Sequence, residues 1–470
     1  MVNNNVFKRL LCGALTLVSL LSLCACAGEE QQVVIPKMEA EKVAKVTFDF
    51  LGGEDVMPLS GYYGPNVLAY SMNGDKFPDY ISDDIMQKIA DCGVNMMHYC
   101  GPGYQSTREA LYDLLALGDK YGVGIFVVDS ELARRSQEGG NAVTDAKFRA
   151  TKLARYTQYD SMCGVYMIDE PGVAYYHPQS EAWRDLSKQV EASKGLNNLG
   201  IVPSINLLPP VTKEDYEPWN RYVKAYIATC NPRYLSYDCY PYISYGNKEV
   251  YFYSMDKMLS YSKQYDVAFW SYIQVGDESE RGAYDIDEGE YNWNINTTLC
   301  FGAKGIEYYL VIQPKSMTQS YTPGQDYDFQ RVALLGADGS KTQWWYYTQK
   351  INTHIRAIDS VLMNSTHKGV IATGESALKL TTGLENMFEG DSWRELKSVE
   401  GDVMIGCFNY QGKTALYVTN FEEAYAQKVT LNLHGTYNLS VTQDAKISYI
   451  QTNELELDLK AGEGVLVVFD

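Results

Sequence analysis

Short apolar runs alternate with longer amphipathic runs along most of this 470-residue chain, from about residue 56 to residue 360. Each apolar run has the length of a buried strand, and each longer run carries apolar residues at helical spacing, as in residues 82–92. Strands that alternate with helices form parallel sheets, so the pattern predicts an α/β fold. The expected strands cover residues 56–63, 94–99, 124–128, 164–168, 200–205, 234–237, 267–273 and 305–312. The expected helices cover residues 82–92, 107–121, 147–159, 179–193, 214–229, 253–265, 293–302 and 340–360.

Eight strand-then-helix units have the number and about the length of a (β/α)8 TIM barrel. An open, doubly wound sheet is the alternative, but it normally carries a glycine-rich phosphate turn after its first strand, and none is present here. We therefore predict a barrel over residues 44–365 that carries the chemistry.

The pattern changes after about residue 366, where short strands are separated by Gly, Asn and charged turns. The strands are expected at residues 403–408, 415–418, 428–433 and 464–469. They predict a small all-β domain, a β-sandwich over residues 366–470, that packs on the barrel without carrying the chemistry.

The first 26 residues have the features of a lipoprotein signal peptide. Lys8 and Arg9 precede an apolar run over residues 10–23 that is too short to span a bilayer comfortably. The small Ala25 before Cys26 favours Cys26 as the lipidated residue, and an ordinary secretory signal is the alternative. Either way we expect an exported protein, with residues 27–43 as a polar tether to a bacterial cell membrane.

Composition narrows the possible partners. The formal charge of −19 argues against nucleic acid and anionic membrane surfaces. The 39 Tyr and 7 Trp suit stacking on sugar rings, although aromatic residues also fill cores. Beyond Cys26 the cysteines are irregularly spaced, without a C-x-x-C pair, and His is scarce, so we expect neither a disulfide framework nor a metal site nor a cofactor.

The stretch at residues 164–172 is an apolar strand that ends in Asp169, Glu170 and Pro171. Two adjacent carboxylates cannot be buried unpaired without a large desolvation cost, and proline cannot donate to a strand ladder. The acids are therefore expected at the carboxyl-terminal edge of the fourth strand, where parallel α/β folds place their ligands.

The other expected strands also end in acids, amides and aromatic residues. Acids can transfer protons, amides and acids bind hydroxyls, and aromatic faces stack on sugars. The candidates at this edge of the barrel are His98, Asp129, Asp169, Glu170, Asn206, Asp238, Tyr240, Tyr242, Trp270, Tyr272, Gln274 and Tyr309.

These features resemble glycoside hydrolases of the (β/α)8-barrel type, in the β-galactosidase-like clan. The resemblance is carried by residues 166–171, by the aromatic strands at 234–242 and 269–274, and by the tail at 461–467. It implies that Glu170, at the end of the fourth strand, is the general acid/base. The clan's nucleophile is a glutamate at the end of the seventh strand, where this chain has Gln274.

Three arrangements could supply the missing group. Asp277 or Glu278, just beyond the seventh strand, could fold back, or Asp238 could act as base or nucleophile from the sixth strand. The Asp-Glu pair also resembles the substrate-assisted hexosaminidases, in which Asp169 would orient the substrate's acetamido group and Glu170 would protonate the leaving oxygen. Tyr240 or Tyr242 would then hold the acetamido oxygen.

We therefore predict an exported, surface-anchored glycoside hydrolase that cleaves β-linked glycans with Glu170 as general acid/base. Its partners would be an oligosaccharide or glycoconjugate, and the membrane only through the lipid anchor. The alternative is a catalytically inactive glycan-binding lipoprotein of the same fold, which Gln274 favours.

Overall fold

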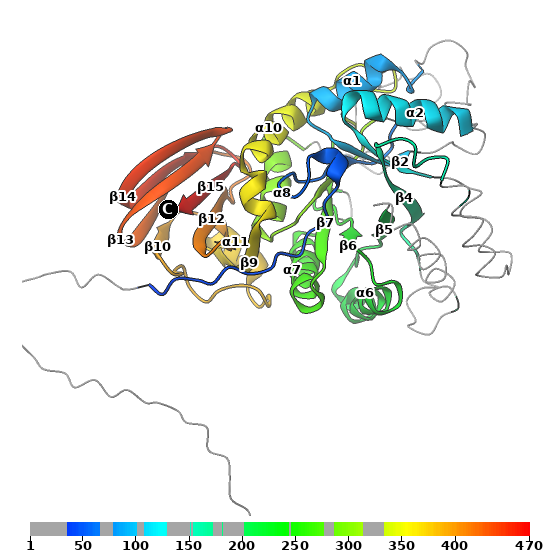
Figure 1. Ribbon diagram of the computed structural model, residues 1–470. Helices are drawn as coiled ribbons and strands as arrows, with labels where there is room; N and C mark the ends of the chain where they lie inside the picture. The colour runs from blue at the N-terminus through cyan, green and yellow to red at the C-terminus, as the bar shows by residue number, and fades with distance from the viewer. Residues whose placement is uncertain are drawn as a thin grey trace, which may run out of the picture. The chain divides into compact units, whose positions relative to one another are not determined.

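The computed structural model describes residues 35–65, 79–100, 108–128, 151, 154–172, 181, 202–243, 246–276, 286–313 and 333–470. In this part of the chain eight parallel strands close into a barrel, each paired with the next and β1 paired with β8 (Figure 1). The predicted fold class is confirmed. The barrel strands are β1 (Leu59–Gly61), β2 (Met96–Cys100), β3 (Gly124–Val127), β4 (Met162–Asp169), β5 (Val202–Leu207), β6 (Tyr234–Tyr237), β7 (Ala268–Gln274) and β8 (Ile306–Tyr309).

Helices follow the strands at the predicted places. The described ones are α1 (Asp83–Asp91), α2 (Arg108–Tyr121), α6 (Tyr216–Cys230), α7 (Lys248–Tyr265), α8 (Glu288–Cys300) and α10 (Gln343–Met363). The helix expected at residues 147–159 is described only at 151 and 154–159, and residues 154–159 form turns and a bend, so the predicted helix does not extend through them. The helix expected at residues 179–193 lies outside the described residues except for residue 181. Local signals define several of the ends: the Asn247 side chain caps the first amides of α7, and Asp287 and Glu290 form a capping box on α8.

Three layers of side chains fill the barrel, because alternate residues of each strand point inward. The lowest layer is aromatic and apolar, with Phe48, Phe126 and Trp270 in one cluster. The middle layer is polar and includes Ser60, His98, Ser204, Ser236 and Glu307, all at most 1% exposed. The uppermost layer holds Tyr62, Tyr166 and Tyr272. The two layers nearer the carboxyl-terminal ends of the strands are therefore more polar than the lowest layer.

The chain after α10 forms one antiparallel sheet that lies against α8 and α10 (Figure 1). Its strands are β9 (Ser365–Ala372), β10 (Leu396–Glu400), β11 (Val403–Tyr410), β12 (Lys413–Asn420), β13 (Gln427–Gln443), β14 (Lys446–Leu459) and β15 (Gly464–Phe469), with the short helix α11 (Glu375–Thr381) after β9. The first part of β13 pairs with β10 and its last part with β15, with an irregularity between Asn432 and Tyr437. The sheet thus curls into a sandwich-like half-barrel around its own apolar core.

The sheet and the barrel share apolar packing as well as polar contacts. The other face of the sheet contributes Met404, Phe408 and Tyr417 to the large core of the barrel and its helices. The Tyr417 hydroxyl donates to Asn296 Oδ1 on α8 at 2.6 Å. The β region therefore packs on the barrel through a buried interface.

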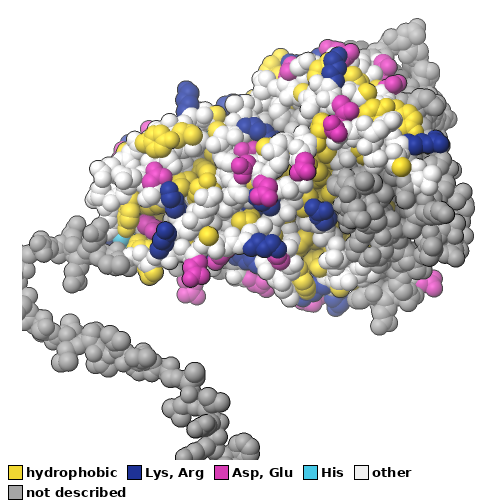
Figure 2. All heavy atoms as spheres, in the orientation of Figure 1, with side chains coloured by type: hydrophobic (Ala, Val, Ile, Leu, Met, Phe, Trp, Pro, Cys, Tyr) yellow, Lys and Arg dark blue, Asp and Glu magenta, His cyan; other side chains and the backbone are white. Residues whose placement is uncertain are grey.

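Charges of both signs are interspersed on the described surface. On the face shown in Figure 2, Lys and Arg side chains lie among Asp and Glu side chains and do not gather in one patch. No helix in the described residues is long and apolar enough to cross a membrane. The cysteines whose side chains are described are buried and free, namely Cys92, Cys163, Cys230, Cys239, Cys300 and Cys407.

Gly164 in β4 leaves no room for a side chain, and its replacement should destabilise the barrel. A Cβ atom there would lie 2.1 Å from the Phe126 ring and 2.5 Å from the Val202 carbonyl oxygen. Gly164→Ala should lower the free energy of unfolding by about 1–3 kcal/mol, the usual penalty of overpacking. The control is Gly172→Ala, three residues past the end of β4, where a Cβ meets no atom of the described residues within 4 Å and the change should stay within about 0.5 kcal/mol. Equal denaturation midpoints for the two variants would contradict this packing.

Candidate active site

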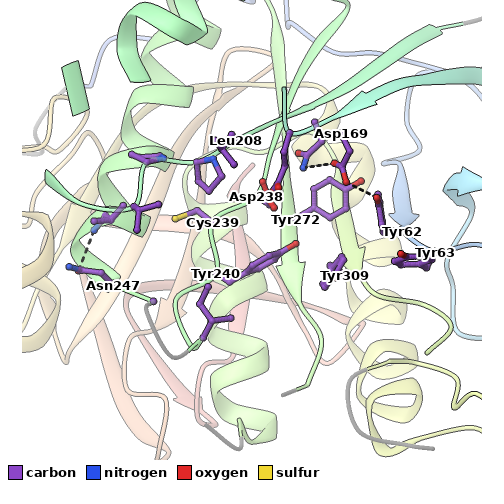
Figure 3. Close-up of a pocket in the computed structure, with 18 residues that line it drawn as sticks. Tyr62, Tyr63, Asp169, Leu208, Asp238, Cys239, Tyr240, Asn247, Tyr272 and Tyr309 are labelled. Carbon is purple, nitrogen blue, oxygen red and sulfur yellow. Dashed lines mark hydrogen bonds between the residues drawn. The ribbon is translucent and has the colours of Figure 1, made fainter. Parts of the chain in front are cut away.

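A cavity of about 400 Å³ opens at the carboxyl-terminal ends of the barrel strands (Figure 3). That volume lies in the range of small-molecule pockets. Acids, an amide and tyrosines line one part of it, and an apolar stretch at residues 208–211 with Ile243 lines another. Seven of the predicted residues line the cavity: Asp169, Glu170, Asn206, Asp238, Tyr240, Tyr272 and Tyr309.

Asp169, the last residue of β4, is held by three donors. The Tyr62 hydroxyl donates to Oδ2 at 2.6 Å, and the Tyr166 hydroxyl donates to Oδ1 at 2.7 Å. The Asn206 side-chain amide donates to Oδ1 at 3.3 Å. Both carboxylate oxygens are thus engaged by the protein, which fixes the orientation of the side chain.

Glu170 follows in an unusual backbone conformation. Its φ is +40°, in the left-handed region that residues other than glycine rarely adopt. Such a residue costs on the order of 1–3 kcal/mol and persists only where its surroundings enforce it. Here the Glu170 amide donates to the Asn206 carbonyl oxygen at 3.0 Å, and Pro171 follows directly. The turn leaves the Glu170 side chain exposed on the wall of the cavity.

Asp238 comes directly after β6 and is only 7% exposed. Burial raises the pKa of Asp238 well above its usual range, and the charge and hydrogen bond of the Glu170 carboxyl and the charge of Asp169 raise it further. Among the described residues no hydrogen-bond donor reaches Asp238 Oδ1, and the Asp238 carboxyl makes a side-chain hydrogen bond with the Glu170 carboxyl. Two carboxyls in such contact cannot both ionise readily, so the contact favours the protonated form of Asp238.

Asn206 joins the three acids. Besides its bond to Asp169, its side chain makes a hydrogen bond to Asp238 that opposes the rise in the Asp238 pKa. Its place follows from the parallel register, which sets Asp169 beside Asn206 and Asn206 beside Ser236.

Tyrosines form the rest of the polar wall. Figure 3 shows Tyr62, Tyr240, Tyr272 and Tyr309 around the space next to Asp169 and Asp238. Tyr62, Tyr63, Tyr166 and Asn247 were not predicted as site residues, although the first three stand at strand ends or at inward positions. The signal for Tyr62 and Tyr166 was their position two residues beyond inward-facing Ser60 and Gly164, on the same face of their strands.

Four predicted substrate contacts do not line the cavity, contrary to expectation. His98 is 0% exposed in the middle layer, and Trp270, also 0% exposed, stacks on Tyr234 below it with ring centroids 4.0 Å apart. The Tyr242 hydroxyl donates to Glu423 of the β region at 2.6 Å. Gln274 Oε1 accepts from the Tyr242 amide at 3.2 Å and Nε2 donates to the Gly276 carbonyl at 3.1 Å. These side chains are buried by packing that a strand-end position alone does not reveal.

Some predictions fall on residues outside the described part of the chain. These are Asp129, Asp277, Glu278 and the lipidation site Cys26. Among the described residues no group of three or more His, Cys, Asp or Glu side chains could hold a metal ion.

The fold of this chain, a closed (β/α)8 barrel followed by an antiparallel β region, is similar to the folds of solved glycoside hydrolases. The β-galactosidase from Bacillus circulans sp. alkalophilus superposes with a TM-score of 0.52 and 9% sequence identity, covering 92% of this chain and 100% of that chain. A protein described as a glycoside hydrolase superposes with a TM-score of 0.51 and 10% identity, covering 92% and 97% of the two chains. No protein-family model and no curated protein matches the sequence. The resemblance expected from the sequence is thus confirmed at the level of the fold.

Replacing Asp238 should make the protein more stable at high pH. Because the folded protein raises the pKa of Asp238 above its usual 3.8, it retains a proton that the unfolded chain loses. The stability contributed by that proton is complete below the usual pKa and is lost as pH rises. Asp238→Asn has no such loss, so its melting temperature relative to the wild type should rise between pH 4 and pH 8.

Asp215→Asn serves as the control with the opposite sign. A hydrogen bond from the Thr212 backbone amide lowers the pKa of Asp215, so the stability that Asp215 contributes is present above the usual pKa and is lost as pH falls. The deficit of this variant should therefore shrink towards acid pH. A melting-temperature difference for Asp238→Asn that does not change with pH would contradict a buried, protonated Asp238.

Proposed function

We propose that this protein is a glycoside hydrolase that cleaves β-linked glycans, with Glu170 as general acid/base and Asp238 as the second catalytic carboxyl. The observation that carries the proposal is the Glu170–Asp238 pair, two carboxyls in contact at the mouth of the barrel with one more exposed and one buried. Hydrolysis of a glycosidic bond needs one carboxylic acid and one carboxylate on either side of the bond, and a pair that holds one proton supplies both.

The two members of the pair differ in access. Glu170 is exposed on the cavity wall, so it can reach the oxygen that leaves with the aglycone. Asp238 lies deeper and faces it from β6. As the glycosidic C–O bond breaks, Glu170 gives the shared proton to the leaving oxygen and Asp238, left as a carboxylate, bonds to the anomeric carbon. Water then hydrolyses this ester and returns its proton to Glu170.

The closeness of the pair favours retention of configuration. Inverting enzymes keep their carboxyls roughly 6.5–9.5 Å apart to admit a water molecule, whereas retaining enzymes hold them at about 5–5.5 Å. Carboxyls in hydrogen-bonding contact leave no space for that water, and a modest movement of the exposed Glu170 would admit the sugar. The substrate-assisted alternative is less favoured, because Tyr62, Tyr166 and Asn206 already occupy the Asp169 oxygens that would orient an acetamido group.

The tyrosines and the apolar wall support a sugar as the ligand. Tyr240 and Tyr309 offer ring faces at the cavity, with centroids 5.7 Å apart. Sugar rings have apolar faces that stack on such rings and hydroxyls that bond to acids and amides. We also propose that the protein is exported and held at the bacterial cell membrane by a lipid on Cys26, as residues 1–26 indicate.

Glu170→Gln should abolish turnover of an aryl glycoside that the mature protein hydrolyses. The panel comprises β-galactoside, β-glucoside and β-N-acetylhexosaminides, with proton NMR of the first-formed anomer to report retention. The loss of kcat should be about 10²–10⁴-fold, since proton transfer is removed. Glu217→Gln, on the exposed face of α6 and away from the cavity, should keep wild-type activity.

Other outcomes separate the alternatives. Hydrolysis restricted to N-acetylhexosaminides that survives Asp238→Asn would favour the substrate-assisted mechanism. Binding of a glycan by calorimetry without turnover on the panel or on longer glycans would favour the inactive binding protein. Turnover that survives Glu170→Gln would remove Glu170 as the acid.

Cys26→Ala should abolish incorporation of labelled palmitate when the full chain is expressed in a bacterium. The thiol of Cys26 is the proposed attachment point, and Ala25 before it fits the signal. Cys24→Ala is the matched control and should keep the label, because the bulky Leu23 precedes Cys24. Label that persists in the Cys26 variant would show that the anchor is absent or lies elsewhere.

A further inference from the structure

The middle layer of the barrel contains an ionisable group that the proposed chemistry does not use. Glu307 on β8 is 0% exposed, and its Oε1 lies 3.1 Å from Nδ1 of the equally buried His98 on β2. Branched apolar residues normally fill such a layer, and an ionisable pair buried there is costly compared with hydrophobic residues of similar volume. The position of this pair directly below the cavity therefore points to a role other than stabilising the fold.

A chain of short contacts leads from Glu307 to the acids of the cavity. The Ser236 hydroxyl lies 2.6 Å from Glu307 Oε2 and 3.2 Å from Asn206 Oδ1. On its other side the Asn206 amide nitrogen donates to Asp169 at 3.3 Å, and Asn206 also bonds to Asp238. Residues of the adjacent strands β4, β5 and β6, together with β8, thus connect a buried carboxyl to two acids at the mouth.

Ser236 has a single hydroxyl hydrogen, so it cannot donate to both neighbours at once. If Glu307 is a carboxylate, it takes that hydrogen. If Glu307 carries a proton, it can donate to Ser236 Oγ, and the Ser236 hydrogen is then available to Asn206 Oδ1. In the second arrangement each group donates to the next one on the way to the acids. Glu307 donates to Ser236, Ser236 donates to Asn206, and the Asn206 NH₂ group faces Asp169 and Asp238.

We propose that Glu307, in its protonated form, is a positioning residue for the acids of the active site, acting through Ser236 on the orientation of the Asn206 amide. The expected effect on the catalytic rate rests on the proposed hydrolase function. The protonation of the Glu307 carboxyl can be tested without that function.

The charges around Glu307 support this arrangement at neutral pH. Burial raises the pKa of Glu307 to about 8, although the hydrogen bond of Ser236 lowers it, and the charge of Asp169 on β4 adds to the rise. Burial also lowers the pKa of His98 to about 3, so His98 is neutral. Tyr234 on β6 and Tyr272 on β7 also face Glu307, and burial raises the pKa of both phenols well above 10.0, so they are neutral. Above about pH 8, Glu307 should ionise, take the Ser236 hydrogen and release Asn206.

Kinetics on the substrate identified above give the first test. Ser236→Ala should lower kcat about 10- to 100-fold, the worth of a hydrogen bond to a charged site, with KM changed less than about threefold. Glu307→Met, which has no donor, should show the same loss, and Glu307→Gln, whose NH₂ group can donate to Ser236, should recover most of it. The fall of kcat near pH 8 should be weaker in Glu307→Gln. The matched control is Ser204→Ala, which changes another buried serine, on β5. The Ser204 hydroxyl makes a hydrogen bond to the Tyr234 hydroxyl at 2.7 Å and is not part of the path from Glu307 through Ser236 to Asn206.

Infrared difference spectra between acid and alkaline pH give a readout that needs no activity. The carbonyl stretch of a protonated carboxyl should be lost near pH 8 in the wild type and in Ser204→Ala, and no such band should titrate near pH 8 in Glu307→Gln, which lacks this carboxyl. A second such band, identified by its absence in Asp238→Asn, should titrate at higher pH in Ser236→Ala, because the Asn206 bond that lowers the Asp238 pKa is loosened.

The kinetic and infrared measurements distinguish a failure of the proposed hydrolase function from a failure of the positioning role. A wild type without turnover would overturn the hydrolase and leave the infrared result to decide the positioning role. Two infrared results would overturn the inference even if the protein is an active hydrolase. One is an Asp238 band that titrates at the same pH in Ser236→Ala as in the wild type, and the other is a carboxyl band that still titrates near pH 8 in Glu307→Gln. Equal losses of kcat in Ser236→Ala and Ser204→Ala would also overturn it, since they would indicate a general packing defect.

Discussion

The pairing of β1 with β8 closes the barrel, and the rest of the structure depends on this closure. It sets Ser60 beside Glu307, although the two residues are far apart in the chain. Because all eight strands run parallel, their carboxyl ends meet at one rim, and residues from different strands face a common space. The register then decides the neighbours: Asp169, Asn206 and Ser236 stand side by side on β4, β5 and β6.

The rim also concentrates polar groups that are costly to bury. Asp169 is stabilised by three donors, whereas Asp238 has the Asn206 bond and otherwise faces another carboxyl. The first arrangement fixes a side chain, and the second raises a pKa. This difference between two neighbouring acids gives the cavity both a rigid anchor and a carboxyl with a raised pKa. Structural strain at Glu170, with its left-handed backbone, accompanies the same site.

The β region contributes to the cavity from a distance. Glu423, which follows β12, accepts a hydrogen bond from Tyr242 and forms an ion pair with Lys248 at the start of α7. Lys248 also lies over the rings of Tyr242 and Trp293, at 5.0 and 4.9 Å from their centroids. These contacts hold the connection between β6 and α7, which includes the cavity residues Tyr240 and Asn247. The region predicted to pack without chemistry thus helps to shape the wall of the site.

By itself the sequence determined the order and kind of the barrel elements and the acids that end β4. Hydrophobic periodicity is a local property, so β6 was predicted at its observed bounds and α2 to within one residue. The long β13 was predicted only in part, and β9, β10 and β14 were not predicted, because their exposed faces and irregular register weaken the alternation. The tertiary structure alone decided which strand-end residues share the cavity. His98, Trp270, Tyr242 and Gln274 have the right residue types at the right strand ends, yet packing from other strands and from the β region buries them elsewhere. The contact between Glu170 and Asp238 likewise depends on the three-dimensional register of separate strands, which no local pattern in the sequence encodes.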